Sequence, residues 1–281
     1  MTLPKKILQL CAAQEVTCVL QRIAIVALTV TLTLQAGCAN IPPGKIEAIE
    51  PLSQPAVNTR VGNAYLFRGF IGVFSTGMNE MNDELAARGI RSHVFQADQW
   101  SSVADAIARE YHDRPNAEPI VLVGHSYGAD NVLRIAQAIK ARNVKIDLIV
   151  TLDPVTPPKV APNVRQVVNL YQSNGGWDAL PWLRGIALEA ETPGSPDSAV
   201  TNINIRTMRK DLLDADLNHF NIEKKPKVHA EVIRRIEQVC VTRVEWARLR
   251  NPIWTVPDLT TVMRQTPPTM RPSAQAQALL N

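Results

Sequence analysis

Residues 124–128, Gly-His-Ser-Tyr-Gly, place a serine between two glycines with the spacing G-x-S-x-G. The apolar run from Ile120 to Val123 before them is typical of a buried strand, and apolar residues with helical spacing follow from Val132 to Ile139. In this strand–turn–helix context the motif predicts a sharp turn that presents the Ser126 hydroxyl as a nucleophile at the carboxyl end of a sheet. The alternative is an ordinary turn in which Ser126 only caps the helix.

A serine hydroxyl needs a general base, usually a histidine that a carboxylate orients. Of the five histidines, His219 stands in a loop, residues 216–221, directly before the helical pattern Lys227 to Cys240. A base has to reach Ser126 from a loop above the sheet, so we predict that His219 is this base. A solvated loop histidine is the alternative. His125 belongs to the sharp turn itself and is expected to pack beside it.

The carboxylate is predicted to be Asp153, which directly follows the β-branched strand pattern of residues 146–152. The end of the next parallel strand lies on the same edge of the sheet as Ser126, and the chain order serine, aspartate, histidine fits a triad. An Asx turn at the strand end is the structural alternative for Asp153. Asp178 competes for the same role, because it follows a second strand-like run, residues 164–171.

Two backbone N–H groups are expected to stabilise an oxyanion. The first is that of Tyr127, at the start of the helix after the nucleophile. The second should come from the glycine-containing residues 68–72, after a strand at residues 63–67, with Phe70 or Ile71 as the donor. A plain glycine-rich turn is the alternative for that segment.

Together these segments resemble the α/β hydrolases of the lipase, esterase and thioesterase kind. The resemblance covers about residues 60 to 245, and it rests on Arg68-Gly69-Phe70, residues 124–128, Asp153-Pro154 and His219. Leu152-Asp153-Pro154 is similar to a segment of pancreatic-type lipases in which the aspartate is the triad acid. The resemblance departs at Arg68, where a histidine is usual. It implies a triad of Ser126, His219 and Asp153 that works without a metal or cofactor.

Strand-like and helical patterns alternate along the chain, which predicts βαβ units and a parallel sheet. Right-handed crossovers then place helices on both faces. The expected fold class is α/β, a three-layer α/β-hydrolase sandwich with a shortened, mostly parallel central sheet and helices on both faces. The domain is expected to span residues 61–245.

Residues 173–202 have little regular pattern and lie between Asp153 and His219 in the chain. A loop of this length in a compact domain is usually functional. We expect it to form a lid or to line an acyl pocket, with Trp177 and Trp182 as substrate-binding residues and Ile71 beside them. The alternative is that both tryptophans pack in the core.

The chain begins with basic residues and an apolar run from Ile23 to Leu34, too short to span a bilayer, for which roughly twenty residues are needed. This pattern predicts a secretory signal in residues 1–37. Ala36-Gly37-Cys38 resembles a bacterial lipoprotein cleavage site, which implies a lipid on Cys38 and a proline-rich tether over residues 38–60. The expected location is the outer membrane, facing the periplasm. An ordinary signal peptide or an uncleaved anchor is the alternative.

The whole chain has 30 Lys+Arg and 26 Asp+Glu. Loss of residues 1–37 would remove three basic residues and one acidic residue and leave a net charge of +2, which gives no reason to expect nucleic-acid binding. The basic residues 224–227 are expected to be a solvated loop. Cys240 is expected to be a small core residue without a disulfide partner. Residues 246–281 are expected to be a proline-rich tail.

The sequence therefore predicts a serine hydrolase that cleaves small acyl esters through an acyl-enzyme, tethered to a membrane by a lipid at Cys38. A thioesterase or acyltransferase would use the same residues, and a non-catalytic, surface-tethered binding protein is the third possibility. No pattern in the sequence points to an oligomeric state.

Overall fold

The computed structural model describes residues 58–69, 75–112, 114, 117–173, 185–193 and 199–250. The chain divides into two units, Met1–Val241 and Thr242–Asn281. The described strands all belong to the first unit: β1 (Asn63–Phe67), β2 (Arg91–Phe95), β3 (Ile120–His125), β4 (Leu148–Leu152), β5 (Gln166–Tyr171) and β6 (Ala199–Asn204). So do the helices α2 (Gly77–Ala87), α3 (Trp100–Tyr111), α4 (Tyr127–Ile139), α5 (Ile205–Met208) and α6 (Pro226–Val239). The second unit contains α7 (Arg243–Arg250).

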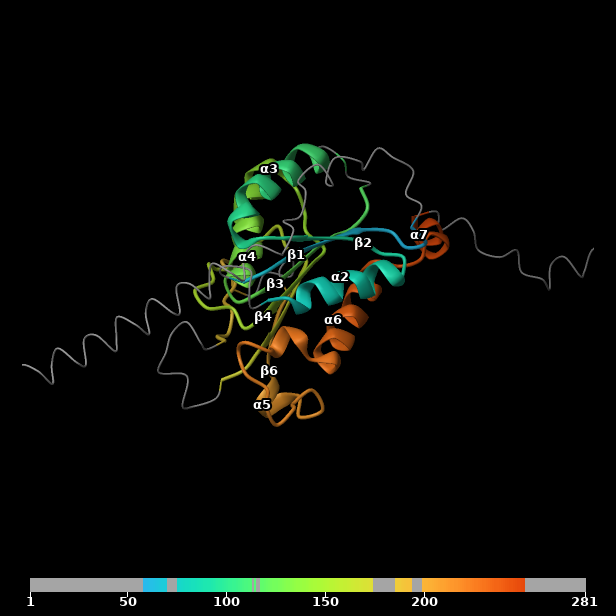
Figure 1. Cartoon of the computed structure of the whole chain (residues 1–281). Helices are drawn as coiled ribbons and strands as arrows, with labels where there is room; N and C mark the ends of the chain where they lie inside the picture. Colours follow the sequence, from blue (N-terminus) through green and yellow to red (C-terminus); the bar gives the residue numbers. More distant parts are fainter. Residues whose placement is uncertain are drawn as a thin grey trace, which may run out of the picture. The chain divides into compact units, whose positions relative to one another are not determined.

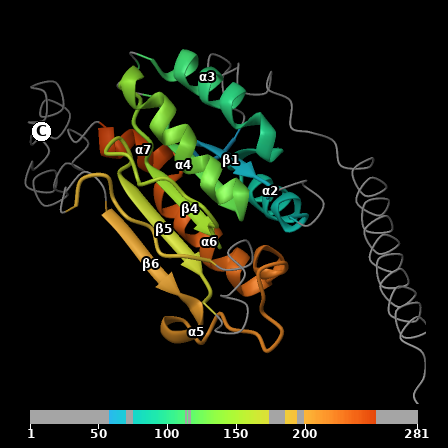
Figure 2. The same cartoon turned by 90° about the vertical axis from the view of Figure 1, so that its left-hand side faces the viewer.

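The six strands form one parallel sheet in the order β2-β1-β3-β4-β5-β6. Figure 2 shows β4, β5 and β6 of this sheet side by side. The chain steps from β1 outwards to β2 and then returns to the other side of β1 for β3. This reversal creates a switch point between β1 and β3, and α/β proteins bind ligands at such a point, beyond the carboxyl ends of the strands. The parallel sheet and the α/β class agree with the sequence prediction.

Helices cover both faces of the sheet, α3 and α4 on one and α2 and α6 on the other (Figure 1). Successive strand residues point to opposite faces, so β1 contributes Tyr65 and Phe67 to the α3–α4 side and Ala64 and Leu66 to the α2–α6 side. Because helices cover both faces, β3 is buried along its whole length. The arrangement is the expected three-layer sandwich.

A polar ladder crosses three neighbouring strands within the sheet. The register sets Thr151 of β4 beside Asn169 of β5, and Asn169 beside Asn202 of β6. Thr151 Oγ1 donates to Asn169 Oδ1 at 2.9 Å, and Asn169 Nδ2 donates to Asn202 Oδ1 at 2.8 Å. Asn202 also accepts from the N–H of Leu188 and donates to its carbonyl. The ladder thus satisfies buried polar groups that would otherwise destabilise the sheet.

The structure adds regular elements where the sequence pattern had indicated none. Residues 199–202, the end of the segment predicted as a lid or substrate loop, belong to β6. Only Ile203 of this strand is buried, so its sequence lacks the apolar run that identifies the central strands. Residues 246–250, the start of the predicted tail, lie in α7.

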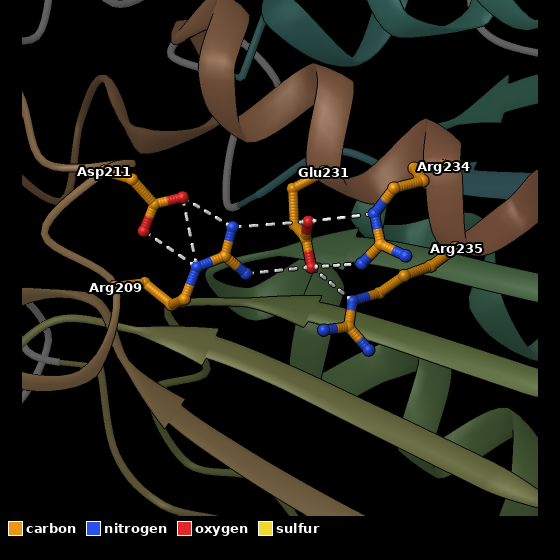
Figure 3. Close-up of polar contacts among 5 residues, drawn as sticks. All are labelled: Arg209, Asp211, Glu231, Arg234 and Arg235. Carbon is orange, nitrogen blue, oxygen red and sulfur yellow. Dashed lines mark hydrogen bonds and ion pairs between the residues drawn. The ribbon is translucent and has the colours of Figure 1, made fainter.

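A charged cluster joins α6 to the chain that follows α5 (Figure 3). The carboxylate of Glu231, which is 5% exposed, contacts Arg209, Arg234 and Arg235 at 3.1, 2.9 and 2.7 Å. Arg209 also pairs with Asp211 at 2.7 Å. Burial alone would raise the pKa of Glu231, but hydrogen bonds from the three arginines lower it to about 2. The cluster therefore keeps Glu231 charged and holds the α5 segment against α6.

Cys240 is fully buried directly after α6, as expected for a small core residue. Burial raises the pKa of its thiol to about 12. Within the described ranges, no helix has the length and apolar character needed to cross a membrane. The predicted signal, Cys38 and most of the tether lie outside these ranges.

Candidate active site

Ser126 lies between the end of β3 and the start of α4, in a backbone conformation that non-glycine residues rarely adopt. Its φ is 57° and its ψ is −125°, and such torsions typically cost roughly 1–3 kcal/mol. A hydrogen bond of 2.9 Å from the Ser126 N–H to the carbonyl of Leu152 ties the turn to β4. The Ser126 side chain makes no capping hydrogen bond to α4. The geometry is therefore that of a nucleophile turn and not of a helix cap.

The two glycines of the motif allow this turn to form. A Cβ on Gly124 would lie 2.3 Å from the carbonyl oxygen of Gly128, and a Cβ on Gly128 would lie 2.4 Å from that of Phe67. Backbone atoms cannot move aside cheaply, so only glycine lets α4 approach β3 and β1 this closely.

His219 reaches Ser126 from the loop of residues 216–221. Its Nε2 lies 3.0 Å from Ser126 Oγ. Local hydrogen bonds shape the loop: the Asn218 N–H donates to Asn221 Oδ1 at 2.8 Å, and the Asn221 N–H donates to the Asn218 carbonyl at 3.2 Å. A neutral imidazole at this distance can accept the hydroxyl proton, which is the role predicted for His219.

Asp153 follows β4 and also has a positive φ, 49°. Its Oδ2 lies 3.3 Å from His219 Nδ1, a close approach whose geometry falls short of a hydrogen bond. Gln172 holds the carboxylate, because its backbone N–H donates to Oδ1 at 2.7 Å and its Nε2 to Oδ2 at 3.3 Å. The structure thus brings Ser126, His219 and Asp153 together. The competing residue Asp178 lies outside the described ranges.

Three residues that the sequence analysis did not single out, Gln172, Arg206 and Gly185, support the Asp153 carboxylate. Arg206 Nη2 donates to Gln172 Oε1 and to the carbonyl of Leu217, each at 2.7 Å. One guanidinium therefore holds both the partner of the carboxylate and the histidine-bearing loop. Gly185 packs against the same carboxylate, where a Cβ would lie 2.2 Å from Asp153 Oδ1. Gln172 directly follows the strand-like run of residues 164–171, at the edge where the site lies, whereas Arg206 has no such signal because no strand pattern precedes it.

Asp130 of α4 fixes the chain just beyond Asp153. Its Oδ1 accepts from the Val155 N–H at 3.0 Å, and its Oδ2 accepts from the N–H and hydroxyl of Thr156 at 2.9 and 3.0 Å. Burial raises the pKa of Asp130, and these three hydrogen bonds oppose that shift. The helix that begins at the nucleophile thereby also positions the segment that carries the acid.

The chain after β1 passes directly beside the nucleophile. A Cβ on Gly69 would lie 3.1 Å from Ser126 Cβ. Arg68 is 2% exposed, and its Nε donates to Asn79 Oδ1 of α2 at 3.1 Å. Tyr127 is the first residue of α4, so its backbone N–H lies at the helix start, next to Ser126. The other predicted site residues lie outside the described ranges: Phe70, Ile71, Trp177 and Trp182.

Phe220 gives the site an exposed apolar surface. Its side chain is 46% exposed, and its ring meets that of His219 edge-on with the centroids 5.7 Å apart. A substrate group that lies over the imidazole from this side would contact an aromatic ring.

The basic residues after the histidine loop are paired with acids. Lys225 contacts Asp216 at 2.7 Å and Lys227 contacts Asp214 at 2.9 Å. In the part of the chain that the structure describes, no group of His, Cys, Asp and Glu side chains is arranged to hold a metal ion.

No protein-family model and no curated protein sequence matches the chain. Several solved structures of α/β hydrolases are similar to it. The thioesterase domain of NocB from the nocardicin cluster is 16% identical over 62% of this chain and 92% of that domain, with a TM-score of 0.37. The esterase domain of a Rhodothermus marinus protein is 12% identical over 66% and 89%, with a TM-score of 0.37. A lidless α/β serine hydrolase from Xanthomonas campestris is 15% identical over 66% and 83%, with a TM-score of 0.35.

At these low identities and TM-scores, the similarity concerns the fold alone. The described part of the chain resembles an α/β hydrolase in its parallel sheet, its nucleophile turn and the chain order of Ser126, Asp153 and His219.

Proposed function

We propose that the protein is a serine hydrolase that cleaves carboxylic esters through an acyl-enzyme intermediate. One observation carries the proposal: Ser126 Oγ lies 3.0 Å from His219 Nε2 at a strained turn, with Asp153 3.3 Å behind the imidazole. Neither pairing is needed to build the sheet, and a strained residue in such a pair suits a nucleophile.

In this mechanism Ser126 Oγ attacks the ester carbonyl while His219 Nε2 takes the hydroxyl proton. The backbone N–H groups of Tyr127 and Phe70 hold the oxyanion, and Asp153 stabilises the imidazolium. The intermediate expels the alcohol, which receives the proton from His219, and leaves an acyl group on Ser126. Water then attacks this acyl group with His219 as the base, which releases the acid and restores the serine.

The test is replacement of Ser126 by alanine, with Ser102→Ala, an exposed serine of α3, as the matched control. Ser126→Ala should lower kcat for a short p-nitrophenyl ester by at least about 1,000-fold at unchanged thermal stability. A fluorophosphonate should label the wild type and the control but not Ser126→Ala. Activity retained by Ser126→Ala, or a wild type that the fluorophosphonate fails to label, would contradict the proposal.

The same site would serve an ester, a thioester or an acyl transfer, since these differ only in the leaving group or acceptor. A series of acyl esters and the matching thioesters, each with and without an added alcohol, separates the three. We expect the highest kcat/KM with oxygen esters and water as the acceptor.

We further propose that a lipid on Cys38 tethers the protein to the outer membrane, facing the periplasm. The support is the signal-like sequence of residues 1–37 and the small residues before Cys38. Cys38→Ser should move the protein from the membrane fraction to the soluble fraction of an expressing bacterium. Membrane association unchanged by this substitution would contradict the proposal.

A further inference from the structure

His125, the residue before the nucleophile, uses both nitrogens of a ring that is almost completely buried. It is 2% exposed; its Nδ1 lies 2.8 Å from Ser75 Oγ and its Nε2 lies 2.8 Å from the backbone carbonyl oxygen of His219. The rings of His125 and His219 are neighbours, with their centroids 5.2 Å apart. A second, buried imidazole therefore lies beside the His219 ring, whose Nε2 is 3.0 Å from Ser126 Oγ.

The chemistry of the partners fixes the direction of these hydrogen bonds. A carbonyl oxygen can only accept, so Nε2 of His125 carries the ring proton and donates a hydrogen bond to the backbone carbonyl oxygen of His219. Nδ1 then accepts from the Ser75 hydroxyl, whose oxygen accepts from the Gly69 N–H at 2.9 Å. Burial, with a smaller contribution from His219, lowers the pKa of His125 to about 3. The ring therefore stays neutral at neutral pH, and the chain of hydrogen bonds keeps one direction.

This chain of hydrogen bonds joins three segments that are far apart in the sequence: the residues after β1, the nucleophile turn and the histidine loop. The segment after β1 enters through Gly69, which lies against Ser126 and directly precedes the proposed donor Phe70. The histidine loop takes part through the backbone carbonyl of His219, whose side chain is the proposed general base. Three of the four hydrogen-bonded residues, Gly69, His125 and His219, are residues of the proposed mechanism or their direct neighbours, and Ser75 links Gly69 to His125.

On the basis of the proposed function, we infer that His125 is a positioning residue that holds the His219 backbone at the level of Ser126 and Asp153. Arg206 holds the same loop at Leu217, so the loop is fixed from two sides of the imidazole. Loss of the His125 contact would let the His219 ring retreat from Asp153, beyond the present 3.3 Å. The imidazolium would then be less well stabilised, whereas binding of the substrate would be little affected.

The test compares His125→Phe, which keeps an aromatic ring but loses both hydrogen bonds, with His125→Gln, which can still donate to the His219 carbonyl. His229→Phe is the matched control. His229 is also buried and also donates to a backbone carbonyl, that of Glu223 at 2.5 Å, but it lies on α6, and its other hydrogen-bond partner in the described part of the chain is Glu84, which has no part in the proposed mechanism. For each full-length variant, kcat and KM for a p-nitrophenyl ester are measured across pH and normalised to the sites that a fluorophosphonate titrates. Thermal unfolding is recorded in parallel.

We expect His125→Phe to lower kcat by about 10- to 100-fold with KM changed less than about threefold, and to move the acid limb of the kcat profile to lower pH. His125→Gln should recover most of the loss. His229→Phe should lose stability but keep the pH profile. A His125→Phe variant that loses stability like the control, yet keeps kcat within about twofold, would overturn the inference and leave the role purely structural.

Ser75→Ala provides the same test if His125→Phe does not fold, because it leaves the ring in place and frees only Nδ1. It should lower kcat several-fold and shift the acid limb in the same direction, and an unchanged profile would count against the inference. Ser126→Ala distinguishes failure of the inference about His125 from failure of the proposed function. If Ser126→Ala is inactive while the His125 and Ser75 variants behave like the wild type, the inference fails and the proposed function stands. If Ser126→Ala stays active, the proposed function itself fails.

Discussion

At the scale of single residues, the site depends on two side chains whose backbones leave the ordinary torsion range. Ser126 and Asp153 have φ angles of 57° and 49°, and each stands just beyond the end of one of two neighbouring strands. A positive φ bends the chain sharply, so each side chain is directed over the edge of the sheet and not along it. The cost of each torsion, roughly 1–3 kcal/mol, is offset by the packing of the surrounding strands and helices.

The glycines of the turn give the first prediction. Gly128→Ala would set a Cβ 2.4 and 2.5 Å from the carbonyl oxygens of Phe67 and Arg68. We expect the free energy of unfolding to fall by about 2–4 kcal/mol and activity to be lost, because α4 must move away from β1 and take Ser126 with it. Chemical denaturation and ester hydrolysis measure the two effects.

Gly69→Ala is the comparison for stability. Its nearest atom would be the Ser75 hydroxyl at 2.9 Å, a group that can rotate, so the free energy of unfolding should fall by less than in Gly128→Ala. Equal losses in the two variants would show that α4 does not lie as close to β1 as the structure indicates.

At the scale of elements, the short helix α5 carries the side chain that connects the support of Asp153 with the histidine loop. Arg206 Nη2 is the donor that reaches both Gln172, which holds Asp153, and the carbonyl of Leu217 in the histidine loop. The helix itself is anchored to α6 through Arg209 and Glu231.

The second prediction compares Arg206 and Arg209, which lie three residues apart and have different partners. Arg206→Met should lower kcat by about 10-fold with KM little changed, since Gln172, which holds Asp153, and the histidine loop lose their shared donor. Arg209→Met should lower the thermal stability without changing kcat, because Arg209 contacts only Asp211 and Glu231 among the residues drawn in Figure 3. The measurement is steady-state kinetics on titrated sites together with thermal unfolding. If both variants had the same kcat, Arg206 would have no special connection to the site.

Much of this architecture could be predicted from the sequence, because the central strands and the turn depend on local patterns. An apolar run marks β3, and the spacing of residues 124–128 marks the turn after it. The support behind the acid could not be predicted in this way. Gln172 and Arg206 are polar residues without a motif, and they meet only because β5 and β6 are neighbours in the sheet. β6 itself was missed because its single buried residue, Ile203, leaves no period to detect.

At the scale of the whole molecule, buried ionisable groups set how stability depends on pH. Glu223 is fully buried, and both Lys224, whose Nζ lies 3.9 Å from Glu223 Oε1, and the backbone N–H of Gly77 favour its charged form and oppose a rise in its pKa. Burial raises its pKa from 4.5 to about 8. Between these values the unfolded chain releases a proton that the native state keeps, so stability falls as the pH rises. Burial lowers the pKa of His125 from 6.5 to about 3, so stability falls as the pH drops below 6.5.

The third prediction follows from these opposite signs. The two slopes, each up to about 1.4 kcal/mol per pH unit, cancel between pH 4.5 and 6.5, where thermal stability should be highest. Below pH 4.5 the loss should steepen, because Glu231, with its pKa lowered to about 2, must also be protonated on unfolding.

Glu223→Gln tests the alkaline side of this profile. The variant should be more stable than the wild type at pH 8, and the difference should fade towards pH 4.5. Asp105→Asn, a change at an exposed residue of α3, is the control and should leave the profile unchanged. Thermal unfolding from pH 3 to 9 provides the measurement, and a Glu223→Gln profile that parallels the wild type would rule out this account.

The polar ladder through Thr151, Asn169 and Asn202 favours a single register of β4, β5 and β6. A parallel strand that slips by one residue turns each side chain to the opposite face, where a stranded amide costs about 1–3 kcal/mol. Asp153, Gln172 and Arg206 follow the three rungs by two, three and four residues, each beyond the end of its strand. The register that pairs the rungs therefore also aligns the acid with both of its supports.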